Sequence, residues 1–596
     1  MGALSVTISK PIISEVTYSD NFTAELLSNI GENKNAQKLL LDYPTVYIIR
    51  DKDNNAQYTV YVGETTNIKR RTGQHLYDDV SKRTDWQQLA TAQQGRMFVI
   101  GHDHFNKSLT LDIENQLMMY LLSVDSIKQL NNRRTNAQNE YYTADELQPI
   151  MSKIWRGLHH YDSKLFPVES LIRDSALFKA SPFHKLTAEQ IAAKQLIYQK
   201  IEHALAQSKT GQLIFVEGEA GSGKTVLLSN LFYELNAELL NQPVTAKIKP
   251  HSYLLINHDQ QLTVYKQIAK KLGLERLDID IVSKPTRFIN RHAAAEKVDV
   301  ILVDEAHLLW TQGKQSYRGK NQLADLLQLA KVVVVVFDRH QMLTTEEYWD
   351  KQELRDMEIE ASTTGNLVQL KDQQRISAEQ PTIDWIRKLV FDRKITPIPA
   401  DKKGYQLKIA PDAQTVYQKI SQHATEKENA AAGLSRILAT FDWKYVNKTA
   451  PADDDYWRVK AGDWSLPWNL QLPQTKAQKR ANRGLAWAEQ PQTIHEAGST
   501  YTIQGFDLNF AGVIIGPSVK YRAGHVIFDP EASENKKATR KRTMKNGEKK
   551  TVADELLQNE LNVLLTRGVH GLFIYAVDPQ LQAALLAAAG SQHLLS

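Results

Sequence analysis

The chain has 596 residues, which is enough for several domains at about 100–200 residues each. It is 42% hydrophobic and 24% charged, as in an ordinary globular protein, and it has no cysteine, which excludes disulfides, thiol catalysis and zinc–thiolate sites. The net charge of +5 is only a weak sign of a polyanionic partner. The apolar run 332–337 is far too short to cross a membrane. We expect a cytoplasmic protein without a membrane partner.

The first part of the chain consists of a segment without a recognisable motif and two β-rich runs. Residues 1–40 have mixed polarity, and we assign them no function. The β-rich run 45–49 is followed by turn residues and by a second β-rich run, 58–63. The basic stretch that comes next predicts a helix on which Arg71 and His75 share one face, because they are four residues apart.

A helix-like segment farther on carries Glu114 beside an apolar stripe, and asparagines follow in the segment 130–134. In this order, over about residues 44–140, the pieces resemble the GIY-YIG nuclease family. The first signature departs from the family because Thr45 replaces its glycine. The two signature tyrosines are separated by thirteen residues, slightly more than the family usually has.

Phosphodiester hydrolysis needs an activated water, neutralisation of a pentacovalent dianion and help for the leaving oxygen. The resemblance implies that Glu114 is the protein ligand of a single Mg²⁺, with Mn²⁺ as an alternative, and that Arg71 clamps the scissile phosphate. It also implies that Tyr47, Tyr61 and His75 position or deprotonate the water. The alternative is a small α/β module whose tyrosines simply pack, in an inactive binding relic.

The segment 151–184 scatters aromatic residues among polar ones and includes the adjacent His159 and His160. No partner ligands lie at a workable spacing for a metal, so we predict a connector packed across two domains. A Leu-Thr-x-x-Gln pattern that ends at Gln190 then resembles the adenine-reading motif of helicases. A side-chain amide suits that role because it donates and accepts at once.

A loop that reads G-E-A-G-S-G-K-T stands between a short apolar run and a helix-like stretch, as the phosphate-binding G-x-x-x-x-G-K-T pattern requires. Its glycines, Gly218, Gly221 and Gly223, let backbone N–H groups close around the phosphates of ATP, and the helix N-terminus adds partial positive charge. Lys224 neutralises the phosphates, and Thr225 offers a hydroxyl to Mg²⁺. The sequence therefore predicts nucleotide binding.

The buried run 298–304 ends in two carboxylates, Asp304 and Glu305. The carboxyl end of a central parallel strand lies at the ligand crevice of an open sheet. We expect Asp304 to hold Mg²⁺ together with the threonine of the loop, and Glu305 to orient or activate the attacking water. Another buried run, 332–337, leads to Gln341, which is placed to sense the γ-phosphate.

Later segments follow the order of helicase motifs, and over about residues 180–580 the chain resembles a superfamily 1 helicase of the Schlafen-like group. The segments concerned are 254–258 and 283–286, where helicases touch the nucleic-acid backbone, then 370–375, 499–507 and 562–568. The resemblance implies that Arg375 reaches the γ-phosphate and that Arg567 is an arginine finger. It assigns Gln504 and Gly505 to the fifth motif. Two lobes of this kind close on ATP and open after hydrolysis.

Two regions allow two interpretations each. The stretch 440–490 holds five tryptophans, for which we favour packing over stacking on unpaired bases. The stretch 531–550, called the basic segment below, holds eight Lys or Arg residues against three Glu. We interpret the basic segment as a flexible solvated loop, with phosphate binding as the alternative.

The predicted fold class is α/β, with a small GIY-YIG α/β nuclease domain followed by two recA-like parallel-sheet P-loop lobes. The predicted parts are an N-terminal segment (1–40), the nuclease domain (41–150), a connector (151–184), a first lobe (185–369) and a second lobe (370–596). We predict an ATP-dependent translocase or helicase with a metal-dependent endonuclease, acting on DNA in anti-phage defence or repair, with RNA left open. The alternative is an ATPase switch that senses nucleic acid or a partner and carries an inactive nuclease-like domain. The sequence leaves the oligomeric state open.

Overall fold

A computed structural model describes most of the chain. The described residues are 8–80, 84–92, 94–131, 141–207, 209–219, 221–241, 249–313, 316–371, 373, 375–425, 433–544 and 547–595. Four stretches with motif predictions lie partly outside them, at Asn132, Arg133 and Arg134 of the asparagine segment, Ala220 of the phosphate-binding loop, Asp372 and Gln374 of the segment 370–375, and Lys545 of the basic segment. The chain divides into two compact units, which are described separately. The first comprises Met1–Ile191, Thr225–Leu254 and Thr263–Ser283, and the second comprises Ala192–Lys224, Leu255–Leu262 and Lys284–Ser596.

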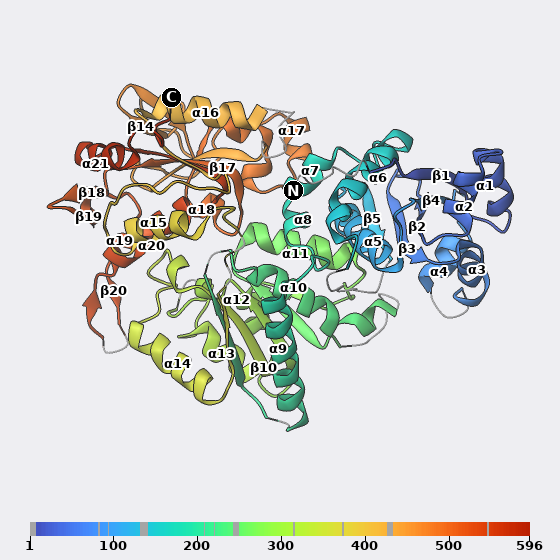
Figure 1. The fold of residues 1–596 in the computed structure, drawn as a ribbon. Helices are drawn as coiled ribbons and strands as arrows, with labels where there is room; N and C mark the ends of the chain where they lie inside the picture. Colours follow the sequence, from blue (N-terminus) through green and yellow to red (C-terminus); the bar gives the residue numbers. More distant parts are fainter. Residues whose placement is uncertain are drawn as a thin grey trace. The chain divides into compact units, whose positions relative to one another are not determined.

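The first unit is built around a mixed sheet with the strand order β1-β4-β2-β3-β5 (Figure 1). Its strands are β1 (Ile12–Thr17), β2 (Thr45–Lys52), β3 (Tyr58–Thr65), β4 (Arg96–Gly101) and β5 (Ile127–Leu130). Neighbouring strands are antiparallel except β3 and β5, which are parallel. The register of β2 and β3 places Tyr47 opposite Gly63. The segment 1–40, to which we assigned no function, supplies β1, α1 and all but the last residue of α2 to this part of the fold.

The helices of the first unit begin and end at the following residues. They are α1 (Phe22–Ile30), α2 (Lys34–Leu41), α3 (Ile68–Gly73), the π-helical turn η1 (Gln74–Asp78), α4 (Thr84–Ala90), α5 (Lys107–Leu122), η2 (Ala144–Glu146), α6 (Leu147–Tyr161), α7 (Glu169–Asp174), α8 (Ala176–Lys179), α10 (Lys224–Leu235), η3 (Ala237–Asn241) and most of α11 (Asp259–Lys271). The helix α5 starts at an N-cap, because the side chain of Asn106 accepts a hydrogen bond from the Leu109 N–H. Apolar residues of α5, among them Ile113 and Leu117, are fully buried, so the helix carries Glu114 into the core at a fixed position.

The connector is packed rather than free. The Trp155 ring of α6 lies edge-on to Tyr120 of α5, with centroids 5.0 Å apart. Farther along, the buried Ser229 and Asn230 of α10 donate hydrogen bonds to the carbonyls of Ala180 (2.8 Å) and Pro182 (2.9 Å). The connector therefore contacts both α5 and α10. Its two histidines donate hydrogen bonds within their own segment, His159 to the Phe166 carbonyl and His160 to the Arg156 carbonyl.

Two further sheets carry the rest of the chain. One has the strand order β11-β6-β10-β9-β7-β8, and the other has the order β12-β22-β17-β13-β16. The strands of the former are β6 (Gln212–Gly218), β7 (Ser252–Ile256), β8 (Val282–Ser283), β9 (Val298–Asp304), β10 (Ala330–Phe337) and β11 (Leu367–Leu370). Those of the latter are β12 (Gln406–Ile409), β13 (Ser435–Ala439), β16 (Ala497–Gly498), β17 (Leu508–Ile515) and β22 (Gly568–Ala576). The pairs β6–β10, β9–β10 and β6–β11 are parallel, as are the neighbours in the latter sheet.

We call residues 209–371, around the former sheet, the first lobe, and residues 375–595, around the latter, the second lobe. Their remaining helices are α9 (Ala188–Ala206), which leads into the first lobe, α12 (Pro285–Arg291), η4 (Ala306–Leu308), α13 (Gln322–Leu329), η5 (Arg339–Gln341), α14 (Lys351–Thr363), α15 (Gln380–Val390), α16 (Ala413–Thr425), α17 (Lys476–Ala481), η6 (Trp487–Glu489), η7 (Pro491–His495), α18 (Thr500–Ile503), η8 (Pro530–Ala532), α19 (Lys536–Thr539), α20 (Ala553–Leu565) and α21 (Pro579–Ala589). Three strand pairs complete the second lobe: β14 (Arg458–Ala461) with β15 (Trp464–Pro467), β18 (Val519–Arg522) with β19 (His525–Phe528), and β20 (Arg542–Thr543) with β21 (Lys549–Lys550). The fold is thus α/β, with a small mixed-sheet domain followed by two parallel-sheet lobes, as predicted.

The tryptophan-rich stretch is core material. Trp468 and Trp487 are fully buried, and Trp443, Trp457 and Trp464 pack against the same apolar cluster of the second lobe. Indoles bury a large apolar area, and this gain accounts for their number here. The structure confirms packing as the role of these residues.

The basic segment is solvated only in part: most of its described Lys and Arg side chains are exposed, but two of its arginines bind acceptors of the first lobe. Its Arg542 is only 8% exposed and donates hydrogen bonds to the carbonyl of Thr345 and to the Thr311 hydroxyl (2.8 Å). Arg540 pairs with Glu346, and the Lys537 carbonyl accepts from the Thr345 N–H. The segment therefore docks the second lobe onto the first, because its arginines find acceptors there that composition alone does not reveal.

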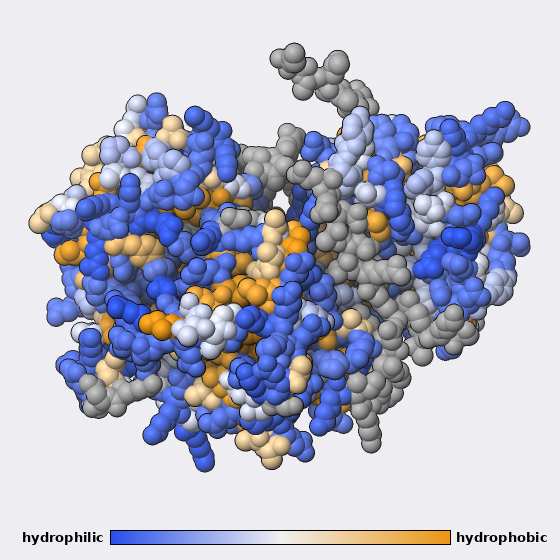
Figure 2. Space-filling model, turned by 60° about the horizontal axis from the view of Figure 1, so that its bottom comes forward, coloured by the Kyte–Doolittle hydropathy of each residue, from blue (hydrophilic) through white to orange (hydrophobic). Residues whose placement is uncertain are grey.

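Among the described residues, every helix is either too short or too polar to span a membrane. The face drawn in Figure 2 is mainly hydrophilic, with smaller hydrophobic areas between the hydrophilic side chains.

Candidate active sites

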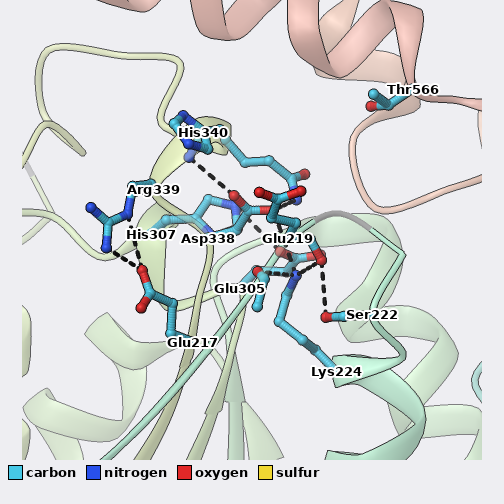
Figure 3. Close-up of polar contacts among 12 residues, drawn as sticks. Glu217, Glu219, Ser222, Lys224, Glu305, His307, Asp338, Arg339, His340 and Thr566 are labelled. Carbon is cyan, nitrogen blue, oxygen red and sulfur yellow. Dashed lines mark hydrogen bonds and ion pairs between the residues drawn. The ribbon is translucent and has the colours of Figure 1, made fainter. Parts of the chain in front are cut away.

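The phosphate-binding loop joins β6 to α10, and its lysine is the first residue of that helix. Gly221 and Gly223 have φ of +87° and +75°, a region of backbone conformation that glycine adopts readily. The Lys224 ammonium donates to the carbonyls of Gly218 (2.7 Å) and Glu219 (2.6 Å) and lies 3.5 Å from the Asp338 carboxylate (Figure 3). The lysine is thus held over the loop, where a phosphate would replace the carbonyls as its partner.

Two carboxylates follow the buried strand β9, as predicted. Asp304 is 1% exposed and accepts a hydrogen bond from the Glu305 N–H, and Glu305 has the left-handed φ of +49°. This turn directs the Glu305 side chain to the Gln261 amide, which donates to it over 3.2 Å, and to the His307 ring at 3.3 Å. Burial alone would raise the pKa of Glu305, yet His307, Lys224 and Gln261 hold it below the ordinary value of a glutamate. Glu305 is therefore ionised at neutral pH, as a base for water must be.

A chain of polar contacts joins the lysine of the first lobe to an arginine of the second. Asp338, which pairs with Lys224, accepts from the Gln341 amide (2.6 Å), and the Gln341 oxygen accepts from Arg567 (2.9 Å). Burial opposes the charge of Asp338, but Lys224 and His307 lower its pKa to about 2. Arg567 is fully buried, and burial lowers its pKa to about 10, so it stays protonated at neutral pH. Gln341 thus connects the two lobes.

The second predicted arginine lies beside the phosphate-binding loop. A Cβ atom added to Gly221 would lie 2.5 Å from the Cβ of Arg375, so the loop passes in contact with this residue. The Arg375 side chain is 14% exposed and forms an ion pair with Asp507 at 2.5 Å. Of the two predicted arginines of the second lobe, Arg375 thus contacts the phosphate-binding loop and Arg567 contacts Gln341.

The fifth predicted motif approaches the same place. Gln504 donates to the Gln341 carbonyl (3.1 Å). Gly505 has a φ of +80°, and a Cβ there would lie 2.4 Å from the Gln261 amide, the group that holds Glu305. Only a glycine allows this close approach, and it links the second lobe to the residue that orients Glu305.

For two residues predicted to bind the nucleotide or its metal ion, Thr225 and Gln190, the structure describes contacts with other protein groups only. Thr225 is the second residue of α10, next to Lys224, and its carbonyl accepts from the Tyr265 hydroxyl (3.3 Å). Gln190 is 5% exposed and forms a capping pair with Thr187, in which its oxygen accepts from the Thr187 N–H (3.0 Å). This pairing fixes the start of α9, and the role of Gln190 at the adenine stays a prediction.

The residues present suit ATP with a divalent ion. The loop supplies positive-φ glycines, a buried ammonium and a helix N-terminus, a donor set that matches phosphate oxygens. Asp304 is a buried carboxylate that accepts a hydrogen bond from the backbone, and carboxylate oxygens are ligands that a hard cation prefers.

The first unit holds the predicted nuclease residues. Tyr47 of β2 and Tyr61 of β3 stack with ring centroids 6.1 Å apart. A Cβ at Gly63 would lie 2.4 Å from the Tyr47 hydroxyl, so the glycine of the second signature is required by space. Thr45, at the position of the missing glycine, is fully buried at the start of β2 without disturbing the strand. Burial and the neighbouring Tyr61 raise the pKa of Tyr47 well above the ordinary value, so its hydroxyl is protonated at neutral pH.

His75 and Arg71 complete this cluster. The His75 Nε2 lies 2.7 Å from the Tyr47 hydroxyl, and Nδ1 lies 2.7 Å from Asp79. Burial works against the charge of Arg71, but the hydroxyls of Tyr47 and Tyr61 raise its pKa, and its side chain remains 35% exposed. The exposed guanidinium next to two tyrosine hydroxyls is suited to hold a phosphate.

Glu114 is 7% exposed on α5, and its charge contributes to the raised pKa of Tyr47, so it belongs to the same cluster. Within the described part of the chain, no group of three or more His, Cys, Asp or Glu side chains is arranged to hold a metal. A single carboxylate fits Mg²⁺, which keeps several waters and takes one or two carboxylates together with substrate phosphate. The donor set therefore suits a weakly held hard cation and does not suit a structural metal.

Sequence reasoning missed two residues that the structure adds. Gln261 orients Glu305, and no pattern marks it, because its partner lies 44 residues away. Asp79 holds His75, and here a signal existed: the spacing of four residues that joins Arg71 to His75 also joins His75 to Asp79.

Comparisons with known proteins agree with this geometry. The family model for the Schlafen group 3 DNA/RNA helicase domain matches residues 211–578, which is more than half of the chain, and the GIY-YIG catalytic domain matches residues 43–119. A relative in Saccharomyces cerevisiae, the uncharacterized protein YPL245W, is 33% identical over 433 residues, which cover 67% of this chain and 90% of the relative.

Solved helicase structures are distant. A structure of two coordinating Pif1 helicases at forked dsDNA is 12% identical and covers 67% of this chain and 94% of its own, with a TM-score of 0.25. The Pif1 helicase of Candida albicans is 17% identical over 40% of this chain and 55% of its own, with a TM-score of 0.19.

Proposed function

This chain belongs to the Schlafen group 3 DNA/RNA helicase family and also carries a GIY-YIG catalytic domain, and we propose that it is an ATP-driven nucleic-acid translocase joined to a metal-dependent endonuclease. Nucleotide and divalent-metal use follow from these two families. We propose Mg²⁺ at both sites, with Mn²⁺ as a substitute at Glu114.

One observation carries the proposal of a motor: the contacts Lys224–Asp338–Gln341–Arg567 run from the phosphate-binding lysine to an arginine of the other lobe. A γ-phosphate beside Lys224 would compete for Arg567, which gives charge-assisted bonds that exist only while the phosphate is present. Gln341 is hydrogen-bonded to both Asp338 and Arg567. If Arg567 leaves Gln341 to bind the γ-phosphate, the contact between the lobes changes. Gln261 holds the Glu305 carboxylate in place, and Glu305 takes the proton of the attacking water.

At the nuclease site we assign roles from position and charge. Arg71 binds the scissile phosphate and offsets the charge that develops on it. Glu114 holds the divalent ion, which supplies Lewis-acid stabilisation of the phosphate when bound. Tyr47 orients and deprotonates the attacking water with His75 as its hydrogen-bond partner, and Tyr61 packs against Tyr47 and keeps its hydroxyl in place.

DNA is the proposed substrate, because GIY-YIG nucleases mostly cut DNA. A role in defence against foreign DNA or in DNA repair would follow from that choice of substrate. RNA is the competing substrate, and the same cleavage assay on matched DNA and RNA strands decides between them.

The test removes one activity at a time. We expect Glu114→Ala to abolish cleavage and to leave nucleic-acid-stimulated ATP hydrolysis unchanged, because Glu114 is the carboxylate of the nuclease cluster. Lys224→Ala and Glu305→Gln should abolish ATP hydrolysis. Phosphate release and strand cleavage are measured together on single-stranded, duplex and forked DNA and on RNA.

Asp112→Asn is the matched control for Glu114, because Asp112 lies on the same helix and accepts from the Tyr141 hydroxyl (2.7 Å) outside the cluster. Cleavage that survives in Glu114→Ala contradicts the metal assignment. ATP hydrolysis without cleavage of any substrate under Mg²⁺ or Mn²⁺ supports the alternative, an ATPase switch with an inactive nuclease-like domain.

A further inference from the structure

His75 is held through both ring nitrogens. It lies in the π-helical turn η1, fully buried, with its ring stacked on Trp86 at a centroid distance of 3.7 Å and an angle of 16°. Nε2 lies 2.7 Å from the Tyr47 hydroxyl, and Nδ1 lies 2.7 Å from the Asp79 carboxylate. The ring is therefore fixed in plane by stacking and in rotation by two short hydrogen bonds.

The carboxylate decides which ring nitrogen carries the proton. An ionised carboxylate has no hydrogen to give, so Nδ1 must donate to Asp79. In the neutral ring Nε2 then has a free electron pair, and it accepts the hydrogen bond from the Tyr47 O–H. The opposite tautomer would place a lone pair against the carboxylate and a hydrogen against the hydroxyl, which reverses the direction of proton flow.

We propose that Asp79 is a positioning residue of the nuclease site, which keeps His75 in the Nδ1–H tautomer so that Nε2 can take the phenolic proton of Tyr47. The inference rests on the proposed nuclease function. As Tyr47 gives its proton to His75, it takes one from the attacking water, and the water oxygen bonds to phosphorus. The bond from phosphorus to the leaving oxygen breaks with its electron pair on that oxygen, which solvent protonates. Asp79 balances the imidazolium charge until His75 returns its proton to solvent.

Besides His75, the described residues include Arg71 as a candidate partner for a purely structural role of Asp79. Arg71 lies 3.9 Å from the Asp79 carboxylate, with both side chains partly exposed. An ion pair that is exposed and this long contributes little to stability. The contact with the buried His75 ring is 1.2 Å shorter than the contact with Arg71, so the histidine is the partner that needs the carboxylate.

The test uses Asp79→Asn in the full chain, because asparagine keeps the shape and can present an N–H to Nδ1. Nitrogen-15 NMR of labelled histidine, assigned with His75→Ala, should show the Nδ1–H tautomer in the wild type and the Nε2–H tautomer in Asp79→Asn. Single-turnover cleavage should slow by about 10²–10⁴-fold, the range for loss of a general base or its tautomer. Substrate affinity and ATP hydrolysis should stay within about threefold, as expected for a group that acts only on proton transfer.

Two further variants separate positioning from packing. Asp78→Asn removes a neighbouring exposed carboxylate and should leave the tautomer unchanged. In a His75→Ala background, Asp79→Asn should cause no further loss, because the residue acts through His75. An unchanged tautomer in Asp79→Asn, wild-type cleavage in that variant, or a full additional loss in the double variant would each overturn the inference. If the wild type cuts nothing but the tautomer still switches, the nuclease function fails and the positioning by Asp79 stands.

Discussion

Arg567 is the residue on which the contact between the lobes most depends. It is fully buried and donates to the Val563 carbonyl (2.9 Å), the Phe506 carbonyl (3.3 Å) and the Gln341 amide oxygen (2.9 Å). A lysine has one nitrogen on a flexible stem and cannot reach three separated acceptors. We therefore expect Arg567→Lys to lower the turnover of ATP by about 10³–10⁵-fold, the effect of losing an arginine finger.

Phosphate release at saturating ATP and single-stranded DNA measures this effect. Arg458→Lys is the matched control, because Arg458 belongs to the same lobe but pairs with its neighbour Asp454 (2.6 Å) away from the nucleotide site. Turnover within tenfold of the wild type in Arg567→Lys would remove Arg567 from the catalytic step.

Residues inside a local pattern could be found from the sequence. The positions of Lys224 and Glu305 follow from glycine spacing and from a buried strand that ends in acids, because both patterns involve neighbours in the chain. Gln261 could not be found, because its role depends on contacts with Glu305 and Gly505, and these residues meet only in the folded protein. Their catalytic roles stay predictions.

The basic segment shows how composition can mislead about an element. Eight positive charges in twenty residues are typical of a solvated loop, yet the arginines at 540 and 542 have partners about two hundred residues earlier. The sign of the charges is visible in the sequence, and the acceptors are not. The tryptophan-rich stretch was predicted correctly because large apolar area favours burial wherever the partners lie.

We expect Arg542→Gln to destabilise the contact between lobes. The substitution leaves the buried Thr345 carbonyl and Thr311 hydroxyl without their donor, at a cost of about 1–3 kcal/mol for each group left unsatisfied. Thermal unfolding of the purified chain measures the loss. Lys549→Gln, an exposed change on β21, should leave the melting temperature unchanged.

The competing role of the basic segment is phosphate binding. Under that role Arg542→Gln would weaken binding of single strands and reduce the slope of log affinity against log salt by about 0.7, without lowering the melting temperature. That outcome would contradict docking of the segment as the function of Arg542.

At the scale of the whole molecule, the sequence predicted the fold class, the order of motifs and a packed connector, but not the side chains that contact the connector and the nuclease domain. Motif order is a property of the chain, whereas these contacts are made by single side chains on α10 and α11. Ser229 and Asn230 of α10 bind connector carbonyls, and Lys271 at the end of α11 donates to the carbonyls of Leu122 (2.8 Å) and Val124 (2.9 Å). Lys271 thus caps the C-terminus of α5, the helix that carries Glu114.

The two ends of α11 contact different parts of the protein. Near its start, Gln261 holds Glu305, and at its end Lys271 holds α5. Each contact lies within its own compact unit, and a single helix is common to both. Within the first unit, Lys271 of α11 thus holds the nuclease helix α5 through two hydrogen bonds.

The cap by Lys271 leads to a prediction about pH. Burial lowers the pKa of Lys271 to about 8, although the charge of Asp125 opposes the shift. Between about pH 8 and the ordinary lysine value of about 10.4, the unfolded chain keeps a proton that the folded chain has lost, so stability rises with pH across this window. Below pH 8 both states are protonated and the full cost of the buried charge is present. Relative to Lys271→Met, the wild type should gain up to about 3 kcal/mol between pH 8 and 10, at 1.36 kcal/mol for each pKa unit.

Thermal unfolding of the wild type and Lys271→Met at pH 7.5, 8.5 and 9.5 measures the gain, with Lys270→Met, an exposed change on the same helix, as the control. The control should follow the wild type at every pH. A difference between wild type and Lys271→Met that is flat or shrinks with rising pH would mean that the lysine is solvated and does not cap α5. In that event α11 would lose its described contact with the nuclease, and the attachment would rest on α10 and the connector alone.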